Sequence, residues 1–361
     1  MTTPRTRKPR PPVDDDDDGA RAERQGVPTV DAPSQGGELG PQAPVEPSGD
    51  RAGTRGSGTP VRLGDRIFSG LSTAAGIFIL VVLASVALFL VTQSIPALTT
   101  DPRTLGAGDS LVSYIAPLAF GTVLAAVIAL LVAIPLSLGI ALFISHYADR
   151  RLARSLGYVV DLLAAIPSII YGAWGLTVLA PYVQPTYRWL AEHVSWLPIF
   201  AGPASSTGRT ILTAGLVLGV MILPIMSAIN REVFLQTPTL HEEAALALGA
   251  TRWEMIRMTV IPYGRSGIVS GAMLGLGRAL GETIAVLLVL SASGAITFNL
   301  ISQSNPYTIP ANIAAQFPEA TGERVNLLIL TGLVLFVITF AVNFAARAVL
   351  ARRADFDGAA G

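Results

Sequence analysis

The chain has 361 residues, of which 51% carry hydrophobic side chains and only 14% are charged, and its mean hydropathy is +0.55. This composition excludes an ordinary soluble domain and predicts a polytopic membrane protein. The formal net charge is zero, which gives no sign of a nucleic-acid partner, and the lack of cysteine excludes disulfides, thiolate metal sites and thiol nucleophiles.

Residues 1–60 are rich in proline, glycine, arginine and acidic residues, and they include the acidic run 14–18. They have no hydrophobic period that could bury one face, so we predict a disordered cytoplasmic tail. The first apolar run begins only at Leu71 and is long enough to span a membrane, which argues against a secretory signal.

Apolar runs of membrane-spanning length then follow along the chain, and they predict an all-α bundle of about six transmembrane helices. The runs are 71–91, 114–145, 159–181, 211–229, 268–290 and 326–346. Within them, Pro135 is expected to kink or break the second helix, and Gly172 and Gly175 are expected to let another helix pack closely against the third.

Arginines set the predicted topology. Arg62 and Arg66 precede the first run, and arginine clusters follow the second, fourth and sixth runs. The positive-inside rule therefore places both termini in the cytoplasm and the loops 92–111, 182–209 and 291–324 outside. The predicted membrane domain covers residues 61–353, with a short C-terminal tail, 354–361, behind it.

A polar stretch, residues 231–265, separates the fourth and fifth runs. Thr239 and Thr251 are each followed three residues later by glutamate, the spacing of a capping box, and Pro238 could instead take the first helical position. Gly249 between them can adopt the left-handed conformation that ends a helix. The stretch therefore predicts a helix, a glycine turn and a second helix that runs towards Pro262.

This stretch resembles the EAA loop of ABC importer permeases. The residues that carry the resemblance are Glu243, Ala244, Ala245, Gly249 and Pro262. The resemblance implies a cytoplasmic coupling helix that docks in a groove of an ATP-binding subunit. Thr259 and Ile261 depart from the isoleucine and leucine that the motif usually carries before its proline. The alternative is a surface amphipathic hairpin without a partner.

Two charges lie within the fifth run. Arg278 and Glu282 are four residues apart, which predicts that they share one helix face. Each costs about 2.5 to 3.5 kcal/mol at the middle of a membrane, so both should face the bundle interior or a wet pathway. They could form an ion pair that only locks packing, or Arg278 could recognise an oxyanion through its planar fork. In the second case Glu282 either holds Arg278 until substrate arrives or accepts a proton from a protonated oxyanion.

The sequence GLGRALGET, residues 275–283, resembles the corresponding stretch of phosphate (Pst) ABC permeases, particularly the PstC type. The resemblance covers roughly residues 62–353 and implies the type I ABC importer permease fold, with Arg278 and Glu282 taking part in phosphate passage. It also implies a PstA-like permease, a PstB-like ATPase dimer, a PstS-like phosphate-binding protein and inorganic phosphate as partners in a lipid bilayer, the plasma (inner) membrane.

The chain itself is expected to be non-catalytic and to hold neither cofactor nor metal. Its single lysine, Lys8, excludes a phosphate-binding loop of the G-x-x-x-x-G-K-[ST] type, so ATP would bind to a partner subunit. Rival interpretations are a PstA-type subunit and a permease for sulfate or molybdate. A rival of another class is an ion-coupled secondary transporter, which should show an inverted repeat, and none is convincing here.

Overall fold

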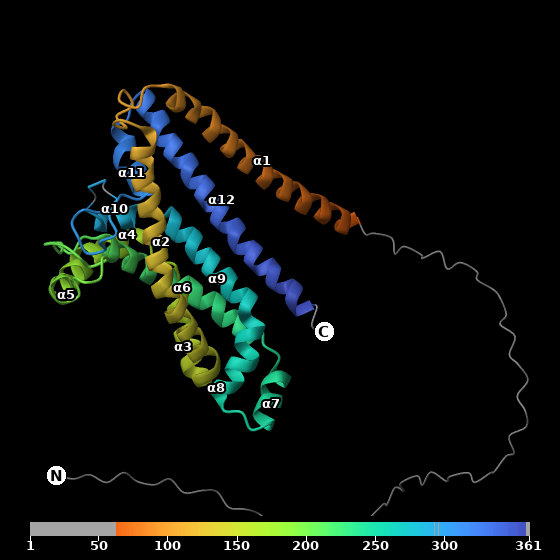
Figure 1. The fold of residues 1–361 in the computed structure, drawn as a ribbon. Helices are drawn as coiled ribbons and strands as arrows, with labels where there is room; N and C mark the ends of the chain where they lie inside the picture. Colours follow the sequence, from red (N-terminus) through yellow and green to blue (C-terminus); the bar gives the residue numbers. More distant parts are fainter. Residues whose placement is uncertain (1–62, 292, 295, 359–361) are drawn as a thin grey trace, which may run out of the picture. The chain divides into compact units, whose positions relative to one another are not determined.

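The computed structural model describes residues 63–291, 293–294 and 296–358, and from Gly64 onward these described residues form one unit (Figure 1). The predicted tail, residues 1–60, lies outside the described residues. Within the described residues the secondary structure is helical, with connecting loops and no strand, which confirms the all-α class.

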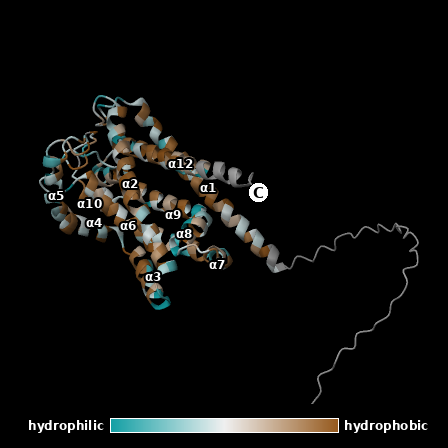
Figure 2. Cartoon of the chain, turned by 60° about the horizontal axis from the view of Figure 1, so that its bottom comes forward, coloured by the Kyte–Doolittle hydropathy of each residue, from teal (hydrophilic) through white to brown (hydrophobic). Residues whose placement is uncertain are grey.

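Among the described residues, four helices are long and apolar enough to cross a membrane, or five if the bent pair described below counts as one span. The four are α1 (Leu63–Thr99), α2 (Leu111–Leu142), α6 (Ile211–Leu235) and α12 (Glu323–Gly358). In Figure 2 hydrophobic colour runs along most of α1 and α2, whereas polar colour gathers at α5 and at the α3, α7 and α8 end. Residues 354–358 of the predicted C-terminal tail belong to α12.

Local signals explain where these helices begin. Ser110 caps α2 by accepting a hydrogen bond from the Ser113 backbone, and Thr210 caps α6 through the Thr213 backbone. Pro135 was expected to kink or break the second helix, and of these two outcomes the break is not present: α2 passes through Pro135 and continues into the π-helical turn η1 (Phe143–Tyr147).

The sequence predicted one helix over the third apolar run, residues 159–181, and this prediction is wrong. The run is divided between α3 (Arg150–Ala164) and α4 (Ser168–Trp174), which continues through η2 (Gly175–Leu179) into α5 (Ala180–His193). The chain bends by 91° at the break. Pro167 explains the bend, because proline disfavours the helical conformation in the residue before it and cannot donate a backbone hydrogen bond.

Helix α6 lies at the centre of the packing and contacts α2, α9 (Ile261–Gly281) and α4. Glycines allow neighbouring helices to approach each other most closely, as the sequence predicted for Gly172 and Gly175 of the third run. A Cβ on Gly172 would stand 2.7 Å from the Ala285 Cα, and one on Gly175 would stand 2.5 Å from a Val217 methyl. The prediction that these two glycines let other helices pack closely is confirmed.

The remaining elements are short. They are α7 (Thr239–Ala247), α8 (Arg252–Met255), η3 (Ile256–Val260), α10 (Ile284–Val289), α11 (Ile309–Gln316) and η4 (Phe317–Glu319). Asn305, which is fully buried, ties the loop before α11 to the start of α6: its Oδ1 accepts from the Ile211 backbone at 2.9 Å. Its Nδ2 lies within 3.3 Å of four carbonyl oxygens.

Candidate functional site

The stretch between α6 and α9 folds as a helix, a glycine turn and a helix, which confirms the predicted order. Gly249 has φ +87°, and its N–H donates to the Leu246 carbonyl at 3.0 Å to close the end of α7. Thr251 and Glu254 form the predicted capping box at the start of α8: the Thr251 N–H donates to Glu254 Oε2 at 2.8 Å, and the Glu254 N–H donates to the Thr251 hydroxyl at 3.3 Å.

Two details of this stretch differ from expectation. No capping box forms at Thr239, because Pro238 occupies the N-cap and the Glu242 carboxylate instead lies 3.3 Å from Nε2 of His146. The second helix does not end near Pro262 but continues through the π-helical turn η3 into α9. Pro262 lies in the first turn of α9, where the wider turn before it accommodates the missing N–H and the ring.

A hollow of 860 Å³ lies on the surface of this helix pair. Ala244, Ala245, Gly249 and Pro262 line it, so the structure brings together all the residues of the EAA-like motif except Glu243, which is exposed outside the lining. Sequence reasoning missed the apolar residues beside them, such as Leu248, which is 90% exposed. Small and apolar side chains concentrated on an exposed hollow are typical of a docking surface.

Arg278 and Glu282 do not share a helix face. Helix α9 ends at Gly281, and Glu282 has extended backbone angles, φ −70° and ψ 129°. Its Oε1 accepts a hydrogen bond from the Ala285 N–H at 3.1 Å, in the first turn of α10, whose N-cap residue is Thr283. Within the described residues the ion pairs are Arg103–Asp109, His146–Glu242 and Arg231–Asp161, so Arg278 and Glu282 are not paired.

Arg278 lines a pocket of 820 Å³ that α6, α9 and α12 form together. Arg347 and Asn343 of α12 and Ser270 of α9 also line it, and its lining contains no carboxylate. Asn343 and Arg347 were not among the predicted site residues. The available signal was an amide in an apolar helix with an arginine four residues later, on the same face. Two guanidinium groups and two neutral hydrogen-bonding side chains suit an anion.

Within the part of the chain that the structure describes, no group of three or more histidine, aspartate and glutamate side chains is placed to hold a metal ion.

The model of one protein family, the binding-protein-dependent transport system inner membrane components, matches residues 133–355, which contain both sites. The fold is similar to that of a bacterial ABC transporter involved in the import of the acidic polysaccharide alginate, with a TM-score of 0.52 and 18% sequence identity. That likeness covers 79% of this chain and 96% of the other. The fold and the family match define a multi-pass inner-membrane permease of the ABC importer class.

Sequence relatives narrow this class. The chain is 47% identical over 306 residues to the phosphate transport system permease protein PstC 2 of Mycobacterium tuberculosis, covering 80% of this chain and 93% of the relative. It is 42% identical over 302 residues to PstC of Mesorhizobium japonicum, covering 80% of this chain and 91% of the relative. The chain belongs to the PstC family of binding-protein-dependent transport permeases.

Proposed function

We propose that this chain is a permease subunit of an ATP-driven phosphate importer, in which it forms half of the translocation pathway. A PstA-like permease supplies the other half, a PstS-like binding protein delivers phosphate, and a PstB-like ATPase dimer binds and hydrolyses ATP. The chain itself carries no catalytic residue. The names of its relatives support phosphate as the substrate.

One observation carries the proposal: Arg278 lies in a pocket with a second arginine and without a carboxylate. The two uses that the sequence left open were a packing ion pair with Glu282 and recognition of an oxyanion. The carboxylate of Glu282 is engaged at the start of α10, which favours the second use. A guanidinium can donate two parallel hydrogen bonds to a tetrahedral oxyanion, and Arg347 in the same lining adds a second fork.

The order of the helices supports a mechanical connection between the proposed ATPase docking surface and the translocation pathway. The hollow around Gly249 is the proposed docking surface for the ATPase, with Glu243, Ala244, Ala245 and Pro262 as its coupling residues. Helical structure then continues from Arg252 through η3 to the end of α9, and Arg278 lies on this rod. At 1.5 Å per residue, the rod between Arg252 and Arg278 is about 39 Å long. Movement of the docking surface would therefore move Arg278 directly.

The proposed topology places the coupling loop, residues 231–265, and both termini in the cytoplasm. The natural chain has no cysteine, so single cysteines can be placed and labelled without background. A cysteine beside Arg252 should react with a membrane-impermeant reagent only after the cytoplasmic side is opened. Labelling from outside would contradict this topology.

The test of the substrate role is phosphate uptake at matched membrane levels of the whole complex. Arg278→Lys should lower uptake at least tenfold, because lysine keeps the charge but lacks the planar fork. Arg188→Lys is the control, since Arg188 is exposed and lies outside both the pocket lining and the coupling loop.

The double variant Arg278→Met with Glu282→Gln removes both charges and tests whether transport needs the guanidinium of Arg278. If Arg278 recognises phosphate, the variant should assemble and fail to transport. Near-normal uptake would reject anion recognition by Arg278, because methionine keeps much of the packing volume of the side chain but can bind no anion. Uptake of labelled sulfate or molybdate in place of phosphate would reject the assigned substrate while retaining the oxyanion class.

A further inference from the structure

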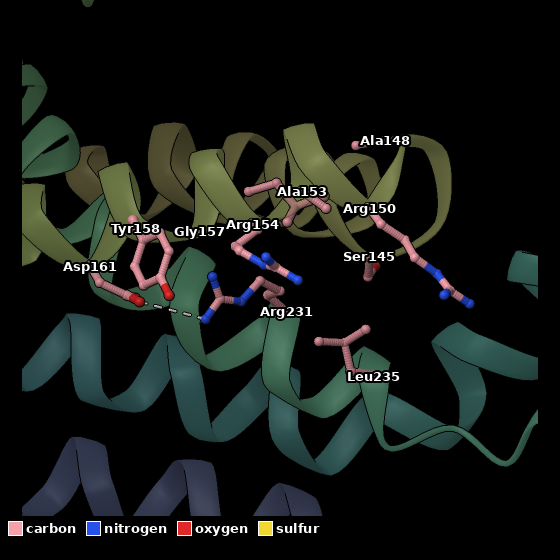
Figure 3. A pocket seen from close by; sticks show the side chains of 11 residues that line it. Ser145, Ala148, Arg150, Ala153, Arg154, Gly157, Tyr158, Asp161, Arg231 and Leu235 are labelled. Atoms are coloured by element: carbon pink, nitrogen blue, oxygen red, sulfur yellow. Dashed lines mark ion pairs between the residues drawn. The ribbon is translucent and has the colours of Figure 1, made fainter. Parts of the chain in front are cut away.

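A second basic pocket lies between α3 and the end of α6, next to the π-helical turn η1 (Figure 3). Its volume is 480 Å³. The polar side chains that line it are Ser145, Arg150, Arg154, Tyr158, Asp161 and Arg231. Neither the motif around Gly249 nor the pocket around Arg278 includes any of these residues, so neither proposed site accounts for them.

The central side chain of this pocket is Arg231, which α6 places across the surface of α3. Its side chain is only 20% exposed. It fits because the facing residue is Gly157: a Cβ at that position would collide with Arg231 Nη1. The missing side chain of Gly157 therefore leaves the space that the Arg231 guanidinium occupies between α3 and α6.

The charges of the pocket are not balanced. Its lining has three arginines and one aspartate, so two positive charges are in excess. Asp161 lies 3.7 Å from Arg231 Nη2, which is beyond hydrogen-bond distance, and its side chain is 51% exposed. The side chains of Arg154, Tyr158 and Arg231 extend into the space between the helices (Figure 3). A doubly charged oxyanion would match both the excess charge and the number of available donors.

Helix α3 also has an exposed apolar side. Leu152, Val159 and Leu162 are exposed and do not line the pocket, and helical periodicity places Leu152 and Val159 on the side opposite Arg150 and Arg154. An amphipathic helix with arginines on one face and exposed apolar residues on the other is typical of a helix that lies in a membrane interface. Arginines at that depth meet the phosphate groups of anionic lipids.

We propose that this pocket binds a phosphate group, with Arg231 as its anchor and Arg150 and Arg154 at its mouth. The group can be presented by an anionic lipid headgroup or as inorganic phosphate, and the exposed apolar side of α3 favours the lipid. The bound lipid would join α3 to the end of α6, the helix that leads into the coupling stretch. This inference does not depend on phosphate being the transported substrate.

The test uses the full chain purified with the subunits that accompany it, placed in nanodiscs. One sample contains phosphatidylglycerol with phosphatidylcholine, and the other contains phosphatidylcholine alone with or without inorganic phosphate. Native mass spectrometry measures retained lipid, and the melting temperature measures stabilisation. Phosphatidylglycerol should be retained and should raise the melting temperature.

Two variants remove the site by different routes. Arg150→Gln with Arg154→Gln removes charge from exposed positions, and Gly157→Val displaces the Arg231 guanidinium without changing charge. Each should lower phosphatidylglycerol retention at least fivefold. Arg151→Gln is the matched control, because Arg151 is exposed on the same helix and outside the lining.

An equal loss in Arg151→Gln would overturn the proposal, since the effect would then be unspecific surface charge. Unchanged retention in Arg150→Gln with Arg154→Gln would overturn it as well, and this variant does not depend on Gly157→Val folding normally. Stabilisation by inorganic phosphate in phosphatidylcholine alone, lost in the pocket variants and kept in Arg151→Gln, would support phosphate recognition and overturn the lipid as its source.

Discussion

The turn between α7 and α8 depends on a backbone conformation that only some residues tolerate. Gly249 has φ +87°, in the left-handed region. A Cβ built on Gly249 meets no atom of this chain within 4 Å. Within the chain, the effect of Gly249→Ala therefore arises from backbone strain and not from crowding.

The strain can be given a magnitude. A residue with a Cβ costs about 1–2 kcal/mol in the left-handed conformation. That free energy lowers the ratio of correctly formed turn to other conformations by roughly 5- to 30-fold. Asparagine tolerates this region better than alanine, so Gly249→Asn should retain more of the turn although its side chain is larger.

The assay is ATP turnover stimulated by the loaded binding protein in the reconstituted complex, together with the amount of ATPase that copurifies. Stimulated ATP turnover should be highest with the natural Gly249, lower in Gly249→Asn and lowest in Gly249→Ala. Gly139→Ala is the matched control, because a Cβ there also meets open space and Gly139 lies within helix α2 with no left-handed backbone. Normal coupling in Gly249→Ala would refute the requirement for this turn. Greater damage from asparagine than from alanine would show that crowding against the partner, and not backbone strain, is the cause.

Three further outcomes are expected. His146→Ala and Glu242→Gln should each loosen α7 from η1 by about 1 kcal/mol, because they break the same contact. The double variant should be no worse than the stronger single variant in amide hydrogen exchange of α7. Gly172→Val should lower the melting temperature by overpacking α4 against α10, which costs about 1–3 kcal/mol, whereas unchanged melting would contradict the close contact. Hydrogen bonds from the Thr251 backbone and hydroxyl lower the pKa of Glu254. The ionised carboxylate therefore stabilises the start of α8 at pH values above the pKa that Glu254 has in the unfolded chain. This stabilisation is lost as the pH falls through the lowered pKa of the folded chain. Amide protection at the start of α8 should fall in acid, and Glu254→Gln should remove that pH dependence.

The features that were predictable from the sequence are those fixed by nearby residues. The capping box at Thr251 depends on a residue three positions away, and the turn at Gly249 depends on one backbone angle. The close packing at Gly172 follows from the small size of glycine, although the sequence could not say that α10 would be the neighbour. Membrane-length runs likewise predicted the four long helices, because their apolar character is a local property.

The features that were not predictable depend on competition between local and distant contacts. Glu242 has the spacing of a capping residue, but its carboxylate lies against His146, which is 96 positions away in the chain. The run 268–290 contains no proline, so it looked continuous, yet α9 ends at Gly281 and a new helix, α10, begins at Ile284, where the Glu282 carboxylate accepts from the Ala285 N–H. Glycine is a weak helix former, which makes a break at this position inexpensive in free energy.

The break after Gly281 changes what Arg278 can do. Had α9 continued, the carboxylate of Glu282 would have lain one turn away and reduced the positive charge of the pocket. Because α9 ends at Gly281, that carboxylate instead accepts a hydrogen bond from the Ala285 N–H of α10, and Arg278 shares the pocket lining with Arg347 of α12. Two like charges raise the energy of the empty pocket, and an entering oxyanion offsets this cost. In the proposed importer, tilting the α8–η3–α9 rod would change the spacing of the two arginines. Binding would then be strong enough for the anion to enter in one position of the rod and weak enough for release in the other.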